Sequence, residues 1–250
     1  MSGQASSQKL MAENPSARKL ASYLEYIDDN RFTFSKELIF DKNYFPEEID
    51  PNYIDKHGNT FLHYAMQFGD MRAVLWLLYY NANPNQADKN GLTPFHLSVQ
   101  YNSYELNSLV LQKGGNPENM DNKNQLPLHF AARANSTNGI RVLLEAGSPI
   151  NPRDINGYTP LFMAVLRESP AAATYLAARG VDINIPDNSG CSPLHWVVTR
   201  RKIEWVRLLL ECGSDPFLKD RDNKSAFDLA CEDTTLRARR DIFMLLQTKK

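Results

Sequence analysis

The sequence predicts an all-α solenoid in which short helix pairs stack along the chain. Three observations lead to this fold class: a fixed internal period, a turn-plus-helix motif that recurs with it, and a residue suited to the left-handed conformation after each second helix. The period is marked by aspartates spaced 33 residues apart: Asp55, Asp88, Asp121, Asp154, Asp187 and Asp220. A period of this length overrides the expectation of ordinary globular domains from 250 residues. One helix pair cannot bury its own apolar face, so the core exists only where copies stack.

The recurring motif is clearest in residues 187–195, where a tight turn leads directly into a helix start. Gly190 can adopt the positive φ that such a turn requires. Ser192 is placed as the N-cap, and Pro193 occupies the first helical position, where its missing N–H does no harm. The motif recurs at residues 91–96 and 157–162, and incomplete copies occur at 58–63 and 124–129. We therefore expect a first helix directly after each turn.

A second helix follows in each copy. In the fifth copy it carries Ile203, Val206 and Leu209 on one face. Each second helix is followed by a residue that tolerates the left-handed conformation: Asn81, Gly114, Gly147, Gly180 and Gly213. The copy that opens at Asp220 keeps the turn and the first helix and then becomes charged from Arg237 to Arg240, as expected of a C-terminal cap.

The chain before the first copy lacks this pattern. Residues 1–15 are polar and aperiodic, which predicts a disordered tail. Residues 16–54 contain an amphipathic stretch around Leu20, Leu24 and Ile27, and we expect a helical N-terminal cap there; a separate binding or targeting element is the alternative. The predicted repeats occupy residues 55–87, 88–120, 121–153, 154–186 and 187–219, with 220–250 as the C-terminal cap.

Composition narrows the classes of function. Basic and acidic residues nearly cancel, 28 against 29, so bulk charge gives no case for binding nucleic acid or membrane. The longest apolar run, Ala73 to Tyr80, is much shorter than a membrane span, and the polar first residues lack the apolar core of a signal peptide. The cysteines Cys191, Cys212 and Cys231 have no metal-type spacing, which favours free thiols in a reducing compartment. We expect a cytoplasmic or nuclear protein.

The helix starts carry a family signature. The pattern T-P-L-H-x-A is matched, with substitutions, at Thr93–Ser98, Leu126–Ala131, Thr159–Ala164 and Ser192–Val197. In these motifs the chain resembles the ankyrin-repeat family, with about six repeats from Asp55 to Lys250. The resemblance implies stacked helix pairs joined by β-hairpin-like loops. It also implies a scaffold for binding other proteins, without naming the partner.

Several positions depart from the family pattern. Phe162 and Asp228 replace the signature histidine. Asn107 falls at a core register of its second helix, where an amide without partners would cost about 1–3 kcal/mol. Glu168 and Arg201 stand in the loop between first and second helices at the position that a glycine fills in the first copy.

Candidate chemical sites have structural explanations. Since His63, His96, His129 and His195 recur once per copy, they do not converge; we expect them to join turn to helix and copy to copy. No phosphate loop, catalytic triad or paired carboxylates can be argued, so we expect no catalytic residues, no metal and no cofactor. The basic cluster at residues 200–202 and that at 237–240 lack interleaved aromatics and are interpreted as solvated faces. Trp76, Trp196 and Trp205 are expected in the core.

The expected function is a non-catalytic protein–protein interaction module, or adaptor, that holds a partner protein in the concave ankyrin groove. Two alternatives remain open: a secreted bacterial effector that mimics eukaryotic scaffolds in a host cell, and, with less support, an enzyme with an unrecognised site. We expect a monomer that binds neither nucleic acid nor membrane. Alignment with designed ankyrin binders places the partner site at Leu92, Tyr101, Met120, Arg133, Arg153, Ile155, Tyr158, Leu166 and Arg167.

One loop also resembles a modification motif. Leu176, five intervening residues and then Asp182–Ile185 resemble the pattern L-x5-[DE]-[VI]-N-V, at which ankyrin loops are hydroxylated on asparagine. The resemblance makes Asn184 a candidate hydroxylation site. The alternative is the family's usual loop asparagine, which also occurs at Asn85 and Asn151.

Overall fold

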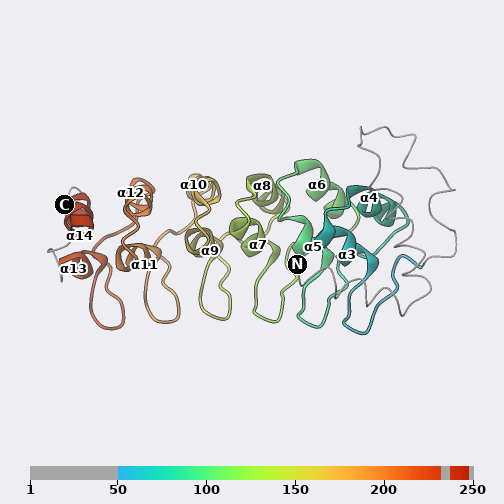
Figure 1. Ribbon diagram of the computed structural model, residues 1–250, viewed down its shortest axis with the longest axis horizontal. Helices are drawn as coiled ribbons and strands as arrows, with labels where there is room; N and C mark the ends of the chain where they lie inside the picture. Colours follow the sequence, from blue (N-terminus) through green and yellow to red (C-terminus); the bar gives the residue numbers. More distant parts are fainter. Residues whose placement is uncertain (1–49, 232–236, 248–250) are drawn as a thin grey trace. The chain divides into compact units, whose positions relative to one another are not determined.

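The structure, a computed structural model, describes residues 50–231 and 237–247 (Figure 1). The chain forms two compact units, Met1–Asn83 and Pro84–Lys250, and each is described by itself. The predicted tail at 1–15 lies outside the described residues, as does nearly all of the predicted cap at 16–54. The predicted domain boundaries therefore stay predictions.

In the first unit, α3 (Phe61–Phe68) packs against α4 (Met71–Tyr79). Thr60 caps α3, and Gly69 ends it with φ of 70°. The Oδ1 atom of Asp70 then accepts the N–H groups of Arg72 and Ala73, both at 3.1 Å, and so begins α4. Leu62, Val74 and Leu77 are fully buried between the two helices' apolar faces.

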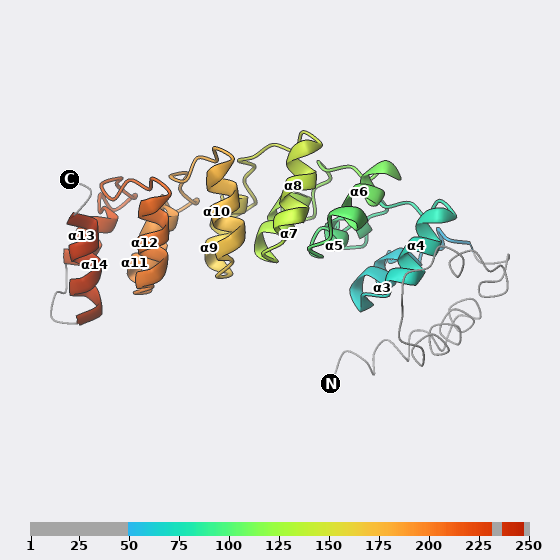
Figure 2. The ribbon, with the colours of Figure 1, turned by 90° about the horizontal axis from the view of Figure 1, so that it is seen from above.

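The second unit is a stack of helix pairs, each with a first and a second helix. The pairs are α5 (Pro94–Ser98) with α6 (Tyr104–Gln112), α7 (Pro127–Arg133) with α8 (Thr137–Glu145), α9 (Pro160–Leu166) with α10 (Pro170–Ala178), α11 (Pro193–Thr199) with α12 (Ile203–Glu211), and α13 (Ala226–Cys231) with α14 (Arg237–Gln247). Within this unit the first helices form one row and the second helices another, and the connecting hairpins project from the first-helix row (Figures 1 and 2).

Short-range hydrogen bonds explain why each hairpin turns and each first helix begins. The Oδ1 atom of Asp88 accepts the N–H groups of Asn90 at 2.7 Å and Leu92 at 2.8 Å. The aspartates at the same position of the later copies make the equivalent bonds: Asp121, Asp154, Asp187 and Asp220. Thr93 then caps α5 with its side chain. Among the described residues the only β pairing is two isolated bridges, so the all-α ankyrin-type solenoid is confirmed as the fold class.

Stacking of the copies builds the core of the second unit. Helix α7 packs against α8 of its own copy and α9 of the next, and α8 packs against both α6 and α10. Leu128, Ile140 and Leu143 are fully buried in these contacts. Each such side chain contributes about 1.5–3 kcal/mol when it is removed from water. No single helix pair can supply this burial alone.

The loops between first and second helices contain the strained positions. Glu168 and Arg201 have φ of 54° and 58°, in the left-handed region that the sequence comparison with Gly69 suggested. A side chain there is disfavoured by roughly 1 kcal/mol relative to glycine. Lys202 Nζ lies 2.7 Å from Glu168 Oε1, but an exposed ion pair offsets little of that strain.

Asn107 is a weak point in the core of the second unit. Its side chain is 0% exposed, and its Nδ2 atom donates to the Tyr101 carbonyl at 3.2 Å. Its Oδ1 atom has no hydrogen-bond partner among the described residues. The Tyr101 carbonyl also accepts from Ser136 Oγ at 3.1 Å, so it stays bonded without the amide.

We therefore expect Asn107→Val to raise the free energy of unfolding by about 1 kcal/mol, because it removes an unsatisfied buried oxygen at nearly constant volume. Urea-induced unfolding of the variant and the parent measures the difference. A less stable variant would mean that the amide has better partners than the structure shows.

Candidate functional site

The signature histidines form a structural ladder. His96 Nδ1 accepts the N–H of Thr93 at 3.2 Å, which makes Nε2 the protonated nitrogen, and Nε2 donates to the Gln125 carbonyl of the next copy at 3.2 Å. His129 and His195 make the equivalent inter-copy bonds, each at 3.1 Å. The predicted role, joining turn to helix and copy to copy, is confirmed for His96, His129 and His195; for His63 the bond that joins turn to helix is present, with its Nδ1 accepting the Thr60 N–H at 3.0 Å.

The two departures from histidine keep part of this geometry. Phe162 is fully buried and its ring lies 4.7 Å from that of Tyr158. Asp228 Oδ2 accepts from the N–H and the Oγ of Ser225, both at 2.8 Å, and from Lys219 Nζ. The hydrogen bond from Lys219, followed by those from Ser225, holds the pKa of Asp228 well below its ordinary value. In this copy the Asp228 carboxylate therefore caps the first helix, at the position where other copies have a histidine that also bonds to the next copy.

The ladder makes stability depend on pH. Burial lowers the pKa values of His96 and His129 below 6.5, against their hydrogen bonds to neighbouring carbonyls. As the pH falls through about 6.5, the unfolded chain takes up these protons while the folded chain does not. The free energy of unfolding should therefore fall below about pH 6.5, by up to about 1.4 kcal/mol per pH unit for each histidine.

Urea unfolding between about pH 7.5 and pH 5.5 tests this expectation. His96→Gln should flatten the dependence because one of the two titrating groups is removed. A free energy of unfolding that rises as the pH falls would contradict the assignment of both imidazoles as neutral.

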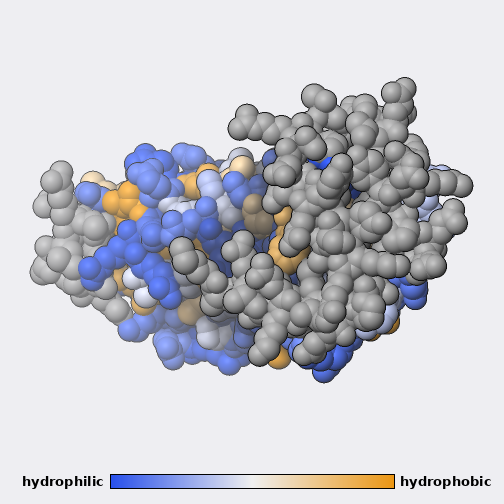
Figure 3. All heavy atoms as spheres, turned by 45° about the vertical axis from the view of Figure 1, so that its right-hand side comes forward, coloured by the Kyte–Doolittle hydropathy of each residue, from blue (hydrophilic) through white to orange (hydrophobic). Residues whose placement is uncertain are grey.

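The predicted partner-binding residues lie on the hairpins or at the C-terminal ends of first helices. We call the surface made by α5, α7, α9 and α11, the residues directly after these helices and the hairpins before them the inner face. Met120 is 61% and Ile155 57% exposed. Arg153 and Arg167 are also exposed, whereas the remainder are half-buried against their own copies: Leu92, Tyr101, Arg133, Tyr158 and Leu166. Five of the nine predicted residues are thus only partly exposed. In Figure 3 hydrophobic atoms occur as scattered spots among hydrophilic ones on the described surface.

Contacts hold several of these side chains in place. The Arg133 guanidinium lies 4.3 Å from the centre of the Phe130 ring. Arg153 Nη2 donates to the Pro186 carbonyl at 3.0 Å and to Asn188 Oδ1 at 3.3 Å, which ties one hairpin to the next. Arg153 therefore links two hairpins, a structural role that was not part of its prediction as a binding residue.

Neighbouring hairpins are also joined through their backbones. Asn188 donates through its N–H to the Asn156 carbonyl at 2.9 Å and through Nδ2 to the Ile155 carbonyl at 2.8 Å. Asn122 makes the equivalent pair of bonds to the hairpin before it. The Ile155 N–H donates to the Lys123 carbonyl at 2.9 Å. The hairpins of this unit are thus pre-organised, which reduces the entropy lost when a partner binds.

Comparison with known proteins agrees with this geometry. The profile described as ankyrin repeats (3 copies) matches residues 30–121, 62–154, 95–187 and 146–220. The chain belongs to the ankyrin-repeat family. A similar solved structure is the ankyrin repeat domain of Bcl-3, described as a unique member of the IkappaB protein family, with 27% identity and a TM-score of 0.67. The match covers 77% of this chain and 87% of that one. The search of curated proteins gave no match.

Asn184, the loop asparagine of the fourth ankyrin repeat, is half-buried and already hydrogen-bonded. Its Oδ1 atom accepts the N–H of Asp215 in the next repeat at 3.0 Å, and its N–H donates to Asp182 Oδ1 at 2.9 Å. Asn85 makes a similar bond to the N–H of Asn116 at 2.8 Å. These contacts are those of a loop that links repeats; hydroxylation of Asn184 stays a proposal.

Two residues of the fifth ankyrin repeat lie on the inner face but were not predicted there: Trp196 and Arg200. Trp196 was expected in the core, like Trp76 and Trp205, which are 7% and 8% exposed. It is instead half-buried, with the Arg200 guanidinium 4.5 Å from the centre of its ring. For Arg200 the signal was available, since it is one period after Arg167, but the alignment stopped at the fourth repeat. For Trp196 there was none, because its equivalent, Met163, is only 6% exposed.

Residues 50–231 and 237–247 contain no group of three or more His, Cys, Asp or Glu side chains that could hold a metal ion. No helix within them is long and apolar enough to cross a membrane. The three cysteines are free thiols: Cys191 and Cys212 are half-buried and Cys231 is exposed.

Proposed function

We propose that the protein is a monomeric, non-catalytic adaptor that binds a partner protein through the inner face, the concave side of its ankyrin repeats. Ankyrin repeats generally mediate protein–protein interaction. The observation that carries the proposal is a pre-organised surface on which Met120 and Ile155 are more than half exposed beside tyrosines and arginines. Met, Tyr and Arg are residue types enriched in interfaces.

The size of the surface fits this role. A stable interface of standard size buries about 1,600 Å² in total, which three or four repeats could supply. The second unit contributes the hairpins and first helices of successive repeats to one face. The hydrogen bonds between hairpins mean that little of this face has to be ordered by the partner.

We expect Tyr158→Ala and Arg133→Ala each to weaken partner binding by about 1–3 kcal/mol while the protein stays folded. The partner is first isolated by affinity purification with mass spectrometry, and its dissociation constant is then measured by calorimetry. The matched control is Tyr175→Ala, which removes a half-buried tyrosine from the second helix α10.

The double variant Tyr101→Ala/Tyr158→Ala decides the matter, because both rings belong to the inner face. Circular dichroism and thermal melts confirm that each variant is folded. If partner binding survives the double change and is abolished by Tyr175→Ala, the inner face is not the binding site.

A further inference from the structure

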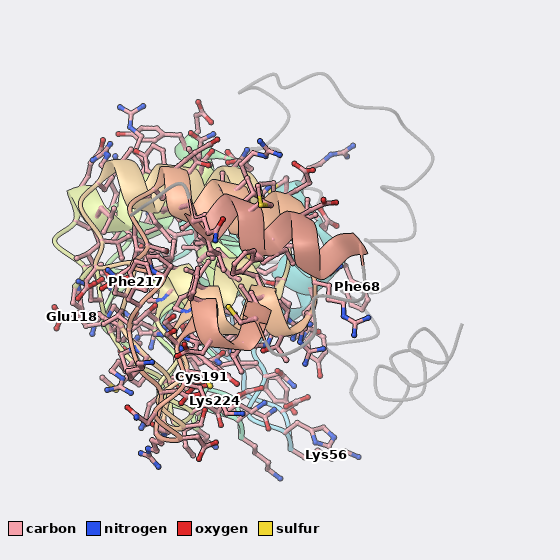
Figure 4. All side chains as sticks on the ribbon, turned by 90° about the vertical axis from the view of Figure 1, so that its left-hand side faces the viewer. Lys56, Phe68, Glu118, Cys191, Phe217 and Lys224 are labelled. Carbon is pink, nitrogen blue, oxygen red and sulfur yellow. The ribbon has the colours of Figure 1, made fainter. Side chains whose placement is uncertain are left out.

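Charge is distributed unequally between the two ends of the stacked helices in the second unit. The loops that follow the second helices mix acidic residues, such as Glu118, Asp182 and Asp215, with basic ones, such as Lys123, Arg153 and Arg221. Glu118 and Phe217, which both belong to such loops, lie at the same side of this unit in Figure 4. At the other end, α7 finishes with Arg133, and the loops that follow α9 and α11 carry arginine and lysine.

The basic end contains one arginine at the end of each of three successive first helices, Arg133, Arg167 and Arg200, here called the arginine row. Arg133 is the last residue of α7, and Arg167 and Arg200 are the C-caps of α9 and α11. Their guanidinium groups have no acidic partner among the described residues. The single acidic residue of these loops, Glu168, is paired with Lys202 at 2.7 Å.

The members of the row are close enough to act on their neighbours. Burial, followed by the charge of Arg167, lowers the pKa of Arg133. Burial raises the pKa of the Tyr158 hydroxyl, and Arg200 acts against that rise. Arg133 and Arg167 are therefore mutually repelling cations beside the aromatic part of the inner face. An anionic partner would relieve this repulsion.

Hydrogen bonds hold the repeats of Arg133 and Arg167 against each other. Ser169 Oγ donates to the Arg133 carbonyl at 3.1 Å, and the Ala172 N–H donates to Asn135 Oδ1 at 2.9 Å. Packed helices lie about 8–10 Å apart, so successive arginines are separated by a similar distance. An extended peptide rises about 3.3 Å per residue, so every third side chain would meet the next arginine.

We propose that the inner face binds an extended, acidic peptide segment whose carboxylates recur at every third residue and pair with Arg133, Arg167 and Arg200. This inference rests on the proposed function and adds the chemistry of the partner. Apolar side chains between the carboxylates lie against Leu166, Tyr158 and the exposed part of Trp196.

A protein segment fits this surface better than a nucleic acid. The rings of Phe130 and Trp196 are already covered by the guanidinium groups of Arg133 and Arg200, at 4.3 Å and 4.5 Å from the ring centres. They are therefore not open platforms for stacked bases.

Fluorescence anisotropy with the full chain tests the proposal. The probe is a fluorescein-labelled peptide, Glu-Leu-Ser-Glu-Tyr-Ser-Glu, and the comparison peptide has the same composition with its glutamates consecutive. The spaced peptide should bind more tightly, and binding should weaken as salt is added. The charge-reversal variant Arg133→Glu/Arg167→Glu/Arg200→Glu should weaken it about tenfold or more.

The matched control reverses three arginines of second helices, Arg141, Arg179 and Arg207, to glutamate. It carries the same change in charge, and circular dichroism verifies that both triple variants are folded. The control should bind the spaced peptide as tightly as the parent protein does, whereas the charge-reversal variant of the row should bind it more weakly. The proposal is overturned if the two peptides bind alike, if neither binds, or if both triple variants lose binding equally.

Two further results separate this proposal from others. If a labelled single-stranded oligonucleotide binds the row more tightly than the spaced peptide, the surface is a nucleic-acid site and the proposal is wrong. If binding of the purified partner protein is lost in Tyr101→Ala/Tyr158→Ala but retained in Arg167→Glu/Arg200→Glu, the proposed function stands and the proposal of an acidic partner is wrong.

Discussion

Gly139→Ala should lower the free energy of unfolding by about 2–3 kcal/mol, although glycine-to-alanine changes in helices usually stabilise. A Cβ atom at this position would lie 2.4 Å from the Val99 carbonyl oxygen and 2.6 Å from Ser136 Oγ. Neither neighbour can move freely, because Ser136 Oγ accepts the Gly139 N–H at 3.1 Å and donates to the Tyr101 carbonyl at 3.1 Å. The overlap would push α8 away from the repeat before it.

The matched control is Gly147→Ala. Gly147 has φ of 84°, and an added Cβ would meet nothing within 4 Å. Its replacement should lower the free energy of unfolding only through backbone strain, by about 1 kcal/mol. Equilibrium urea unfolding compares the two variants. A Gly139→Ala protein more stable than the parent would show that α8 does not approach Val99 as closely as the structure has it.

His129→Ala should lower the free energy of unfolding by about 2–4 kcal/mol, because it removes two hydrogen bonds and leaves a cavity. His129 is 0% exposed; its Nδ1 atom accepts the Leu126 N–H at 3.0 Å, and its Nε2 donates to the Tyr158 carbonyl at 3.1 Å. Leu126 has no side-chain oxygen with which to cap α7, so this repeat relies on the histidine more than its neighbours do.

The control for this substitution is His57→Ala, since the His57 side chain is exposed. That change should leave the midpoint of thermal unfolding nearly unchanged. If His129→Ala melts with His57→Ala at the midpoint of the parent, the histidine ladder does not hold neighbouring repeats together.

The parts of the fold that could be predicted are those that local chemistry determines. Asp88 and its equivalents accept turn N–H groups within four residues, and caps such as Thr93 act within three, so both leave a mark in the sequence. Asn81, with φ of 60°, shows the same for the residue after a second helix. The period follows because each repeat reuses these short-range interactions.

The surface could be predicted less well because exposure depends on side chains from adjacent repeats. Arg153 was assigned to the partner site, but its bonds to the Pro186 carbonyl and Asn188 Oδ1 cross to the next hairpin. Trp196 was assigned to the core from its helical register alone, whereas it supports Arg200 at the surface. The position of a residue within its own helix does not show how much of its side chain the neighbouring repeat covers.

Hydrogen–deuterium exchange with and without the purified partner tests the central claim, that the inner face is the binding surface, most directly. The account predicts slower exchange on binding in the hairpins at residues 120–124, 153–158 and 187–191. The second helices α8, α10 and α12 should exchange as they do in the free protein. Slower exchange confined to those second helices, with the hairpins unchanged, would contradict the account.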